Sequence, residues 1–221
     1  GNFDDALSLV RSLSERNSTV LVNSLNPHRL EGQKTAAFEI VESLEDAPDH
    51  VFIPVGNAGN ITAYWRGFTE AKELGWAAAR PKMMGFQAEG AAPIVKGAPV
   101  EDPETIASAI RVGNPASWHR ATRAAEESGG TIEAVSDKDI LDAYKKMAQV
   151  EGIFCEPAAA ASVAGLLKLA ENGLQLKGKR IVCIITGTGL KDPDLAENLE
   201  PVAMGEYPAE LEALEKALAL V

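Results

Sequence analysis

Short apolar, β-branched runs alternate along this chain with longer segments in which apolar residues recur at helical spacing. The short runs predict strands at 19–22, 50–55, 82–87, 131–135 and 179–185. The longer segments predict helices at 3–16, 30–44, 61–74, 103–112, 115–128, 136–150, 157–172 and 209–220. Such alternation favours the α/β class, with a doubly wound, mostly parallel sheet that carries helices on both faces.

Composition narrows the kinds of partner. With 221 residues and 46% apolar content, the chain can bury a sizeable core. Its 32 acidic and 21 basic residues give a net charge of −11, which argues against a nucleic acid or an anionic membrane as the main partner. Cys155 and Cys183 lie in apolar stretches without metal-ligand spacing, so we expect core positions, no metal site and a reducing, cytoplasmic setting.

The loop Gly56–Asn60 lies between a predicted strand and a predicted helix, and reads Gly-Asn-Ala-Gly-Asn. Its glycines permit close backbone approach, and its amides together with the positive end of the following helix could hold a phosphate dianion. The loop matches neither the dinucleotide-binding pattern Gly-x-Gly-x-x-Gly nor a P-loop. A tight turn that uses Gly and Asn for left-handed backbone angles is the alternative interpretation.

Three further loops follow predicted strands, where ligands bind in open parallel sheets. The first, 23–33, places Arg29 among small hydrogen-bonding side chains that suit a phosphate or carboxylate, although this loop taken alone favours an Asn-Pro turn with a solvated Arg29. The second, 86–93, suits the wall of a cleft. In the third, Thr186 ends a buried strand before two glycines and could bond a heterocyclic nitrogen or only backbone groups. Glu156 reads as a first-turn acid of the helix that follows it.

Several long phrases of the sequence are chemically particular. They include Asn-Ser-x-Asn-Pro-His-Arg-Leu-Glu-Gly-Gln-Lys-Thr at 23–35, Pro-Val-Gly-Asn-Ala-Gly-Asn-Ile-Thr at 54–62, Arg-x-Gly-Asn-Pro-Ala-Ser-Trp at 111–118, Gly-Ile-Phe-Cys-Glu-Pro-Ala at 152–158 and Thr-Gly-x-Gly-Leu-Lys-Asp-Pro at 186–193. In this order they resemble the threonine synthase family, which belongs to the tryptophan-synthase-β-like, fold type II enzymes that depend on pyridoxal 5'-phosphate (PLP). The resemblance runs from Gly1 to about Pro193.

The resemblance implies PLP as cofactor and O-phosphohomoserine as substrate, which water converts to L-threonine and phosphate. The residues that it implies for the cofactor phosphate are Gly56, Asn57, Ala58, Gly59 and Asn60. Thr186 would meet the pyridine nitrogen of the cofactor. The residues implied for the substrate phosphate are Asn23, Ser24, Arg29 and Asn57. At Ala159 the chain departs from the Ser that the family often carries there.

The resemblance also places the Schiff-base lysine in a segment before Gly1, so we expect no catalytic lysine in this chain and no turnover by these residues alone. Lys34 is not expected to replace it, because Lys34 lies in the helix-forming part of a phrase that the family already contains. Residues 1–22 are then expected to end a smaller N-terminal domain, and 23–221 to form the large PLP-binding domain.

Two rival functions remain open from the sequence. Another PLP lyase of the same fold, such as a threonine dehydratase or a cysteine synthase, would keep the glycine-rich loop but has no evident need for Arg29 together with Asn23 and Ser24. A non-catalytic ligand-binding domain is the rival from a different class. The resemblance further implies a homodimer in the complete enzyme.

Overall fold

Four parallel strands form the central sheet of the structure, a computed structural model that describes residues 3–23, 26–199 and 207–217. The strands are β1 (His50–Pro54), β2 (Lys82–Ala88), β3 (Thr131–Val135) and β4 (Ile181–Cys183), in the order β3-β2-β1-β4. Every pair of neighbours runs parallel. The predicted class, an α/β fold with a parallel, doubly wound sheet, is confirmed.

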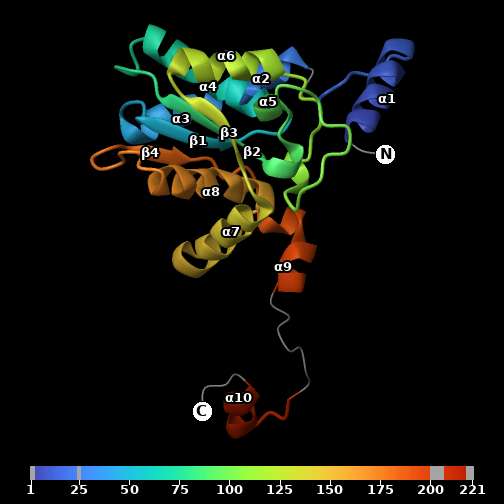
Figure 1. Ribbon diagram of the computed structural model, residues 1–221, viewed down its shortest axis with the longest axis vertical. Helices are drawn as coiled ribbons and strands as arrows, with labels where there is room; N and C mark the ends of the chain where they lie inside the picture. Colours follow the sequence, from blue (N-terminus) through green and yellow to red (C-terminus); the bar gives the residue numbers. More distant parts are fainter. Residues whose placement is uncertain (1–2, 24–25, 200–206, 218–221) are drawn as a thin grey trace. The chain divides into compact units, whose positions relative to one another are not determined.

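Helices cover both faces of this sheet (Figure 1). α4 (Gly59–Glu73) and α6 (Trp118–Ser128) lie on one face, and α7 (Asp137–Glu151) and α8 (Pro157–Glu171) lie on the other. On the α8 face the rings of Phe52 and Phe86 are fully buried and stack with centroids 5.8 Å apart. A Cβ atom at Gly165 of α8 would collide with the Phe86 ring, so the missing side chain lets α8 pack closely on β2.

The strand order reverses at β1. From β1 the chain passes through α4 to β2 and through α6 to β3, and then returns through α7 and α8 to β4 on the other side of β1. In open α/β sheets, ligands bind at this switch point, outside the carboxyl ends of the strands. The fold therefore directs attention to the loops that follow β1 and β4.

The helix predicted at 30–44 is two helices, α2 (Pro27–Gln33) and α3 (Thr35–Leu44), separated at Lys34. α4 approaches so closely here that a Cβ atom at Gly67 would collide with the Lys34 carbonyl. The Thr35 hydroxyl also donates to the Gly32 carbonyl (2.7 Å), which stabilises the turn. Packing against another helix therefore interrupts a segment whose periodicity is helical throughout.

The prediction of a helix at 103–112 is wrong, since the only helical turn there is the 3-10 turn η2 (Ser108–Ile110). The carboxylate of Asp137 accepts hydrogen bonds from the Thr105 hydroxyl and from the Ile106 N–H (3.1 Å). These groups come from positions far apart in the sequence, so apolar periodicity gives no sign of them. An external acceptor thus replaces the intrahelical bonds that this segment would otherwise form.

The prediction of a buried strand at 19–22 is also wrong. Val20 and Val22 are 77% and 73% exposed, and the described sheet contains no strand from this segment. Without a neighbouring strand, β-branched residues have neither ladder hydrogen bonds nor cross-strand packing to hold them in a sheet.

The other described elements are α1 (Phe3–Arg16), η1 (Glu89–Ala91), α5 (Pro93–Lys96), η3 (Gly189–Lys191), α9 (Pro193–Leu199) and α10 (Leu211–Ala217). Residues 1–191 and 192–221 form two compact units. α1 confirms the helix at 3–16, and α10 confirms the described part of the helix at 209–220. Cys155 is buried, whereas Cys183 is only half-buried. None of the helices in the described ranges is long and apolar enough to span a bilayer.

Candidate functional site

A cavity of about 360 Å³ opens at the switch point, between the ends of β1 and β4. It brings together three regions that the sequence analysis singled out: Arg29 from α2, the loop Gly56–Asn60, and Thr186. Further lining residues that the sequence analysis did not assign include Gln33, Tyr64, Ile110, Glu156 and Lys191. Asn23 is not among the lining residues, and Ser24 lies outside the described residues.

The loop after β1 leads into α4, and its N–H groups from Gly56 to Asn60 have no backbone acceptor among the residues that the structure describes. Ala58 adopts a left-handed conformation (φ 62°, ψ 8°) and caps α4 without a side-chain hydrogen bond. The first N–H groups of any helix lack intrahelical acceptors, and here they lie at the positive end of a 15-residue helix. Gly59 is buried, yet a Cβ atom there would meet only Leu30 Cδ2, at 3.9 Å. The loop therefore combines anion-binding donors with room for a ligand.

Asn57 is held in this loop by one side of its amide. Its Oδ1 accepts the Ala116 N–H (2.6 Å), and its backbone carbonyl accepts the Ser117 N–H (3.2 Å). Its Nδ2 is buried and has no hydrogen-bond partner within the described part of the chain. An unpaired buried donor is costly unless a ligand satisfies it. A phosphate oxygen would satisfy Nδ2, so the residues present fit the phosphate group of a cofactor.

Gly56 fixes this loop against the segment that precedes α6. A Cβ atom at Gly56 would lie 2.9 Å from the Cα of Ile110, so only glycine permits this approach to η2. Because the bonds from Ala116 and Ser117 also end on this loop, α6 begins later than the predicted helix at 115–128.

Arg29 reaches the cavity from α2. The Asn26 side chain caps this helix by accepting the His28 N–H (2.9 Å), and Pro27 occupies its first position. Arg29 and Gln33 stand one turn apart, on the same face, and both line the cavity. The exposed guanidinium of Arg29 has no hydrogen-bond or ion-pair partner among the described residues. We call the loop Gly56–Asn60 at the start of α4 the cradle. A planar guanidinium without an ion-pair partner among the described residues, lying beside this cradle, is suited to bind a second anion.

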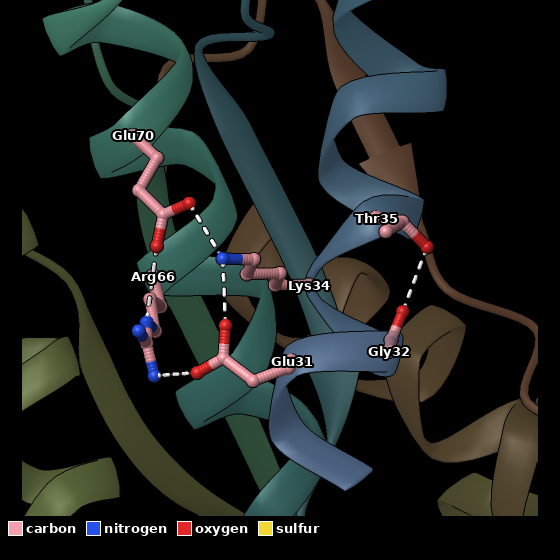
Figure 2. Close-up of polar contacts among 6 residues, drawn as sticks. All are labelled: Glu31, Gly32, Lys34, Thr35, Arg66 and Glu70. Atoms are coloured by element: carbon pink, nitrogen blue, oxygen red, sulfur yellow. Dashed lines mark hydrogen bonds and ion pairs between the residues drawn. The ribbon is translucent and has the colours of Figure 1, made fainter. Parts of the chain in front are cut away.

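The Lys34 ammonium is held in a network of ion pairs (Figure 2). Its ammonium lies 2.7 Å from a carboxylate oxygen of Glu31 and 2.7 Å from one of Glu70, and Arg66 pairs with the same two acids. The hydrogen bonds to Glu31 and Glu70 raise the pKa of Lys34, whereas a Schiff-base lysine needs a readily available neutral amine. This network joins α2 to α4, which are the two helices that carry Arg29 and the cradle.

Replacing Lys34 with Met is expected to reduce the stabilisation that the protein gains as pH rises from about 3 to about 5. Lys34 lowers the pKa values of Glu31 and Glu70 from 4.5, so it stabilises the fold above that pH. This contribution is lost as pH falls through the lowered pKa values. Melting temperatures across this pH range test the expectation, with the exposed Lys72→Met on α4 as control. An identical pH dependence in wild type and Lys34→Met would contradict it.

Thr186 follows β4, and its hydroxyl contacts Glu156, which the sequence pattern predicts to be only a first-turn acid of a helix. The Thr186 hydroxyl donates to Glu156 Oε1 (2.9 Å), and Glu156 Oε2 lies 3.5 Å from the Lys191 ammonium. Glu156 is 4% exposed and precedes α8 without capping it through its side chain. An acid before Pro and an alanine-rich helix resembles any first-turn acid, so only the tertiary contact reveals this role.

The chain is similar to known proteins over almost its whole length. Residues 1–187 match the family described as pyridoxal-phosphate dependent enzymes. A threonine synthase from Synechocystis sp. is 56% identical over 99% of this chain and 57% of its own length. One from Bacillus sp. is 54% identical over 97% of this chain and 61% of its own length. The resemblance seen in the sequence is thus confirmed.

Among solved structures, maize serine racemase superposes with a TM-score of 0.71 at 18% identity, covering 90% of this chain and 60% of that one. At this identity the likeness concerns the fold alone, and it agrees with the parallel sheet and its helices. The match over residues 1–187 shows the family itself: the chain belongs to the pyridoxal-phosphate-dependent enzymes.

Proposed function

We propose that the chain is the cofactor-binding part of a threonine synthase, which converts O-phosphohomoserine and water to L-threonine and phosphate. The observation that carries the proposal is that one cavity is lined both by the cradle at the start of α4 and by Arg29, whose guanidinium is unpaired among the described residues. A lyase that releases phosphate needs both, since it must hold a permanent cofactor phosphate and a departing substrate phosphate.

The cradle suits the permanent phosphate. The N–H groups of Gly59 and Asn60 and the Nδ2 of Asn57 would bind its oxygens, and Thr186 would meet the ring nitrogen at the other end. When bound, PLP supplies an electron sink for negative charge that develops on the substrate. The cradle contains no Lys or Arg, so it would orient the cofactor through the backbone and the helix dipole.

Arg29 suits the departing phosphate. Its guanidinium would bind two phosphate oxygens at once and stabilise the charge that grows as the carbon–oxygen bond breaks. Asn57, which belongs to the cradle, also lines this cavity and would assist. Asn23 and Ser24 complete the proposed substrate group. The domain division after residue 22, a cytoplasmic location and a homodimeric enzyme belong to the same proposal.

The chain spans 57% of the length of the Synechocystis threonine synthase and 61% of the length of the Bacillus one. We therefore expect the rest of the complete enzyme to supply further residues of the site. Lys191 is the one lysine that lines the described cavity, and its ammonium faces Glu156. We therefore propose that the Schiff-base lysine belongs to sequence outside these residues.

The test is an assay of the full-length enzyme with PLP and O-phosphohomoserine, in which L-threonine and phosphate should appear in equal amounts. The 221-residue chain assayed in parallel should show no turnover. If the full-length enzyme instead deaminated threonine and released no phosphate from O-phosphohomoserine, the proposal would be overturned in favour of a dehydratase.

A further inference from the structure

A second cavity, of about 480 Å³, opens between α3 and the turn that follows α4. Its lining residues are Phe38, Val41, Glu42, Glu45 and Trp76, and we call this set the aromatic groove. None of the five lines the cavity at the switch point. The proposed function therefore makes no use of this groove.

Phe38 and Trp76 form two walls of the aromatic groove that stand nearly at right angles. Their ring centroids lie 5.4 Å apart, and their planes differ by 80°. Phe38 packs against the hydrophobic core, and the neighbouring Val41 is only 4% exposed, so this wall is fixed. Trp76, in contrast, is 56% exposed. The groove therefore offers aromatic surface to a ligand from solvent.

The turn that carries Trp76 is tied to the end of α3. The Trp76 N–H donates to the Ala71 carbonyl of α4 (2.8 Å). Asp46 Oδ1 accepts the Ala47 N–H (2.7 Å) and also the Ala78 N–H (2.9 Å), which joins the two segments. Because these bonds involve no ligand, the two rings keep their arrangement when the groove is empty. Such a preformed site loses little conformational entropy on binding.

Two acidic side chains complete the groove. Glu42 and Glu45 are exposed, and within the part of the chain that the structure describes neither side chain forms an ion pair or a hydrogen bond. In water, a glutamate side chain carries a negative charge at neutral pH. Arg180 also reaches the end of α3, but its guanidinium binds the Leu44 carbonyl (2.8 Å) and lies 3.7 Å from Asp46. The groove thus pairs aromatic walls with two carboxylates that have no ion-pair partner there.

Glu45 occupies a backbone position that suits glycine. It follows α3 in the left-handed conformation (φ 59°, ψ 8°), and glycine is the usual residue at this place after a helix. Among the described residues, Ala58 of the cradle is the other non-glycine residue with a positive φ. Glycine at position 45 would relieve the backbone and remove the carboxylate at once, so a single substitution separates binding from stability.

We propose that the aromatic groove binds a small organic ammonium ion whose nitrogen carries methyl groups. A cation near the face of Trp or Phe is attracted by the negative face of the ring, and the two carboxylates add attraction between opposite charges. Methyl groups suit the apolar walls, because they bury apolar surface and need no hydrogen-bond partner. A bare primary ammonium is strongly hydrated and would lose more of its water on entering the groove.

The experiment is an NMR titration of choline, a trimethylammonium ion, with the full-length enzyme loaded with PLP. Ring currents move methyl resonances upfield when the methyl groups lie over aromatic rings, so we expect a saturable upfield shift. Contacts at an exposed site are weak, and we expect a Kd of about 1 mM. The neutral isostere 3,3-dimethyl-1-butanol keeps the shape and lacks the charge. It should bind about 10- to 100-fold more weakly.

Three variants locate the site. Trp76→Leu should weaken choline binding about 2- to 5-fold and remove most of the upfield shift. Glu45→Gly should weaken it about fivefold, with a melting temperature equal to or above that of the wild type. A purely structural role for Glu45 would not produce this combination. Glu171→Gln, at an exposed end of α8 outside the groove, should bind choline as the wild type does.

Equal binding of choline and its neutral isostere would overturn the inference, because the groove would then be only an apolar surface. The absence of a saturable shift in the wild type at about 50 mM choline would also overturn it. Wild-type binding in both Trp76→Leu and Glu45→Gly would place the bound choline elsewhere on the protein. None of these results depends on turnover of O-phosphohomoserine, so the inference and the proposed function can fail separately.

Discussion

Replacing Asn57 with Asp in the full-length enzyme is expected to weaken PLP binding by at least about 100-fold and to leave the fold intact. Aspartate keeps the oxygen that accepts the Ala116 N–H, so the anchoring bond of 2.6 Å survives. It replaces the unpaired Nδ2 donor with a negative oxygen that faces a phosphate dianion. Two unit charges about 4 Å apart repel by about 4 kcal/mol at an effective dielectric constant of about 20, and about 1.4 kcal/mol is a factor of ten in affinity.

Titration of the apoenzyme with PLP, followed by absorbance, measures this loss of affinity, and a thermal melt checks the fold. Gln175→Glu, an exposed position with the same change of charge, serves as the control and should bind PLP as the wild type does. Unchanged PLP affinity in a well-folded Asn57→Asp enzyme would show that the phosphate lies elsewhere.

Replacing Arg29 with Ala is expected to lower kcat/KM for O-phosphohomoserine by about 10- to 100-fold, because a hydrogen bond to a charged group contributes about 1.5–3 kcal/mol. Arg29 is exposed and its guanidinium is unpaired among the described residues, so melting temperature and PLP affinity should not change. Lysine keeps the charge but loses the planar fork, so Arg29→Lys should recover only part of the activity.

Steady-state kinetics of the full-length variants measure this effect. Arg123→Ala, at an exposed position of α6, removes a positive charge far along the sequence and should keep wild-type kcat/KM. Wild-type kinetics in Arg29→Ala would remove Arg29 from the site and weaken the case for a phosphorylated substrate.

The sequence predicts what is local. Strands β1, β2 and β3 and helices α4, α7 and α8 follow from apolar periodicity, and the cap of α7 from Ser136, which forms a capping box with Asp139. The anion site at Gly56–Asn60 follows from its place between a strand and a helix. Most of its donors are backbone N–H groups, so the glycines and the position of the loop suffice to predict that it can bind an anion.

The sequence does not predict what depends on distant contacts. Asp137 prevents a helix at 103–112, and the approach of Gly67 divides the helix at Lys34. The contact of Glu156 with Thr186 cannot be predicted from the local sequence either, because the two residues lie 30 positions apart. In each case a tertiary neighbour overrides a local pattern, and the pattern itself is unchanged.

The proposed function depends above all on the start of α4, which we propose holds the cofactor phosphate. A crystal structure of the full-length enzyme with PLP tests it most directly. We expect phosphate oxygens about 2.7–3.2 Å from the backbone nitrogens of Gly59 and Asn60 and from Asn57 Nδ2, the distances of ordinary hydrogen bonds. A phosphate bound away from the start of α4, with Asn57 Nδ2 still unpaired, would contradict the account.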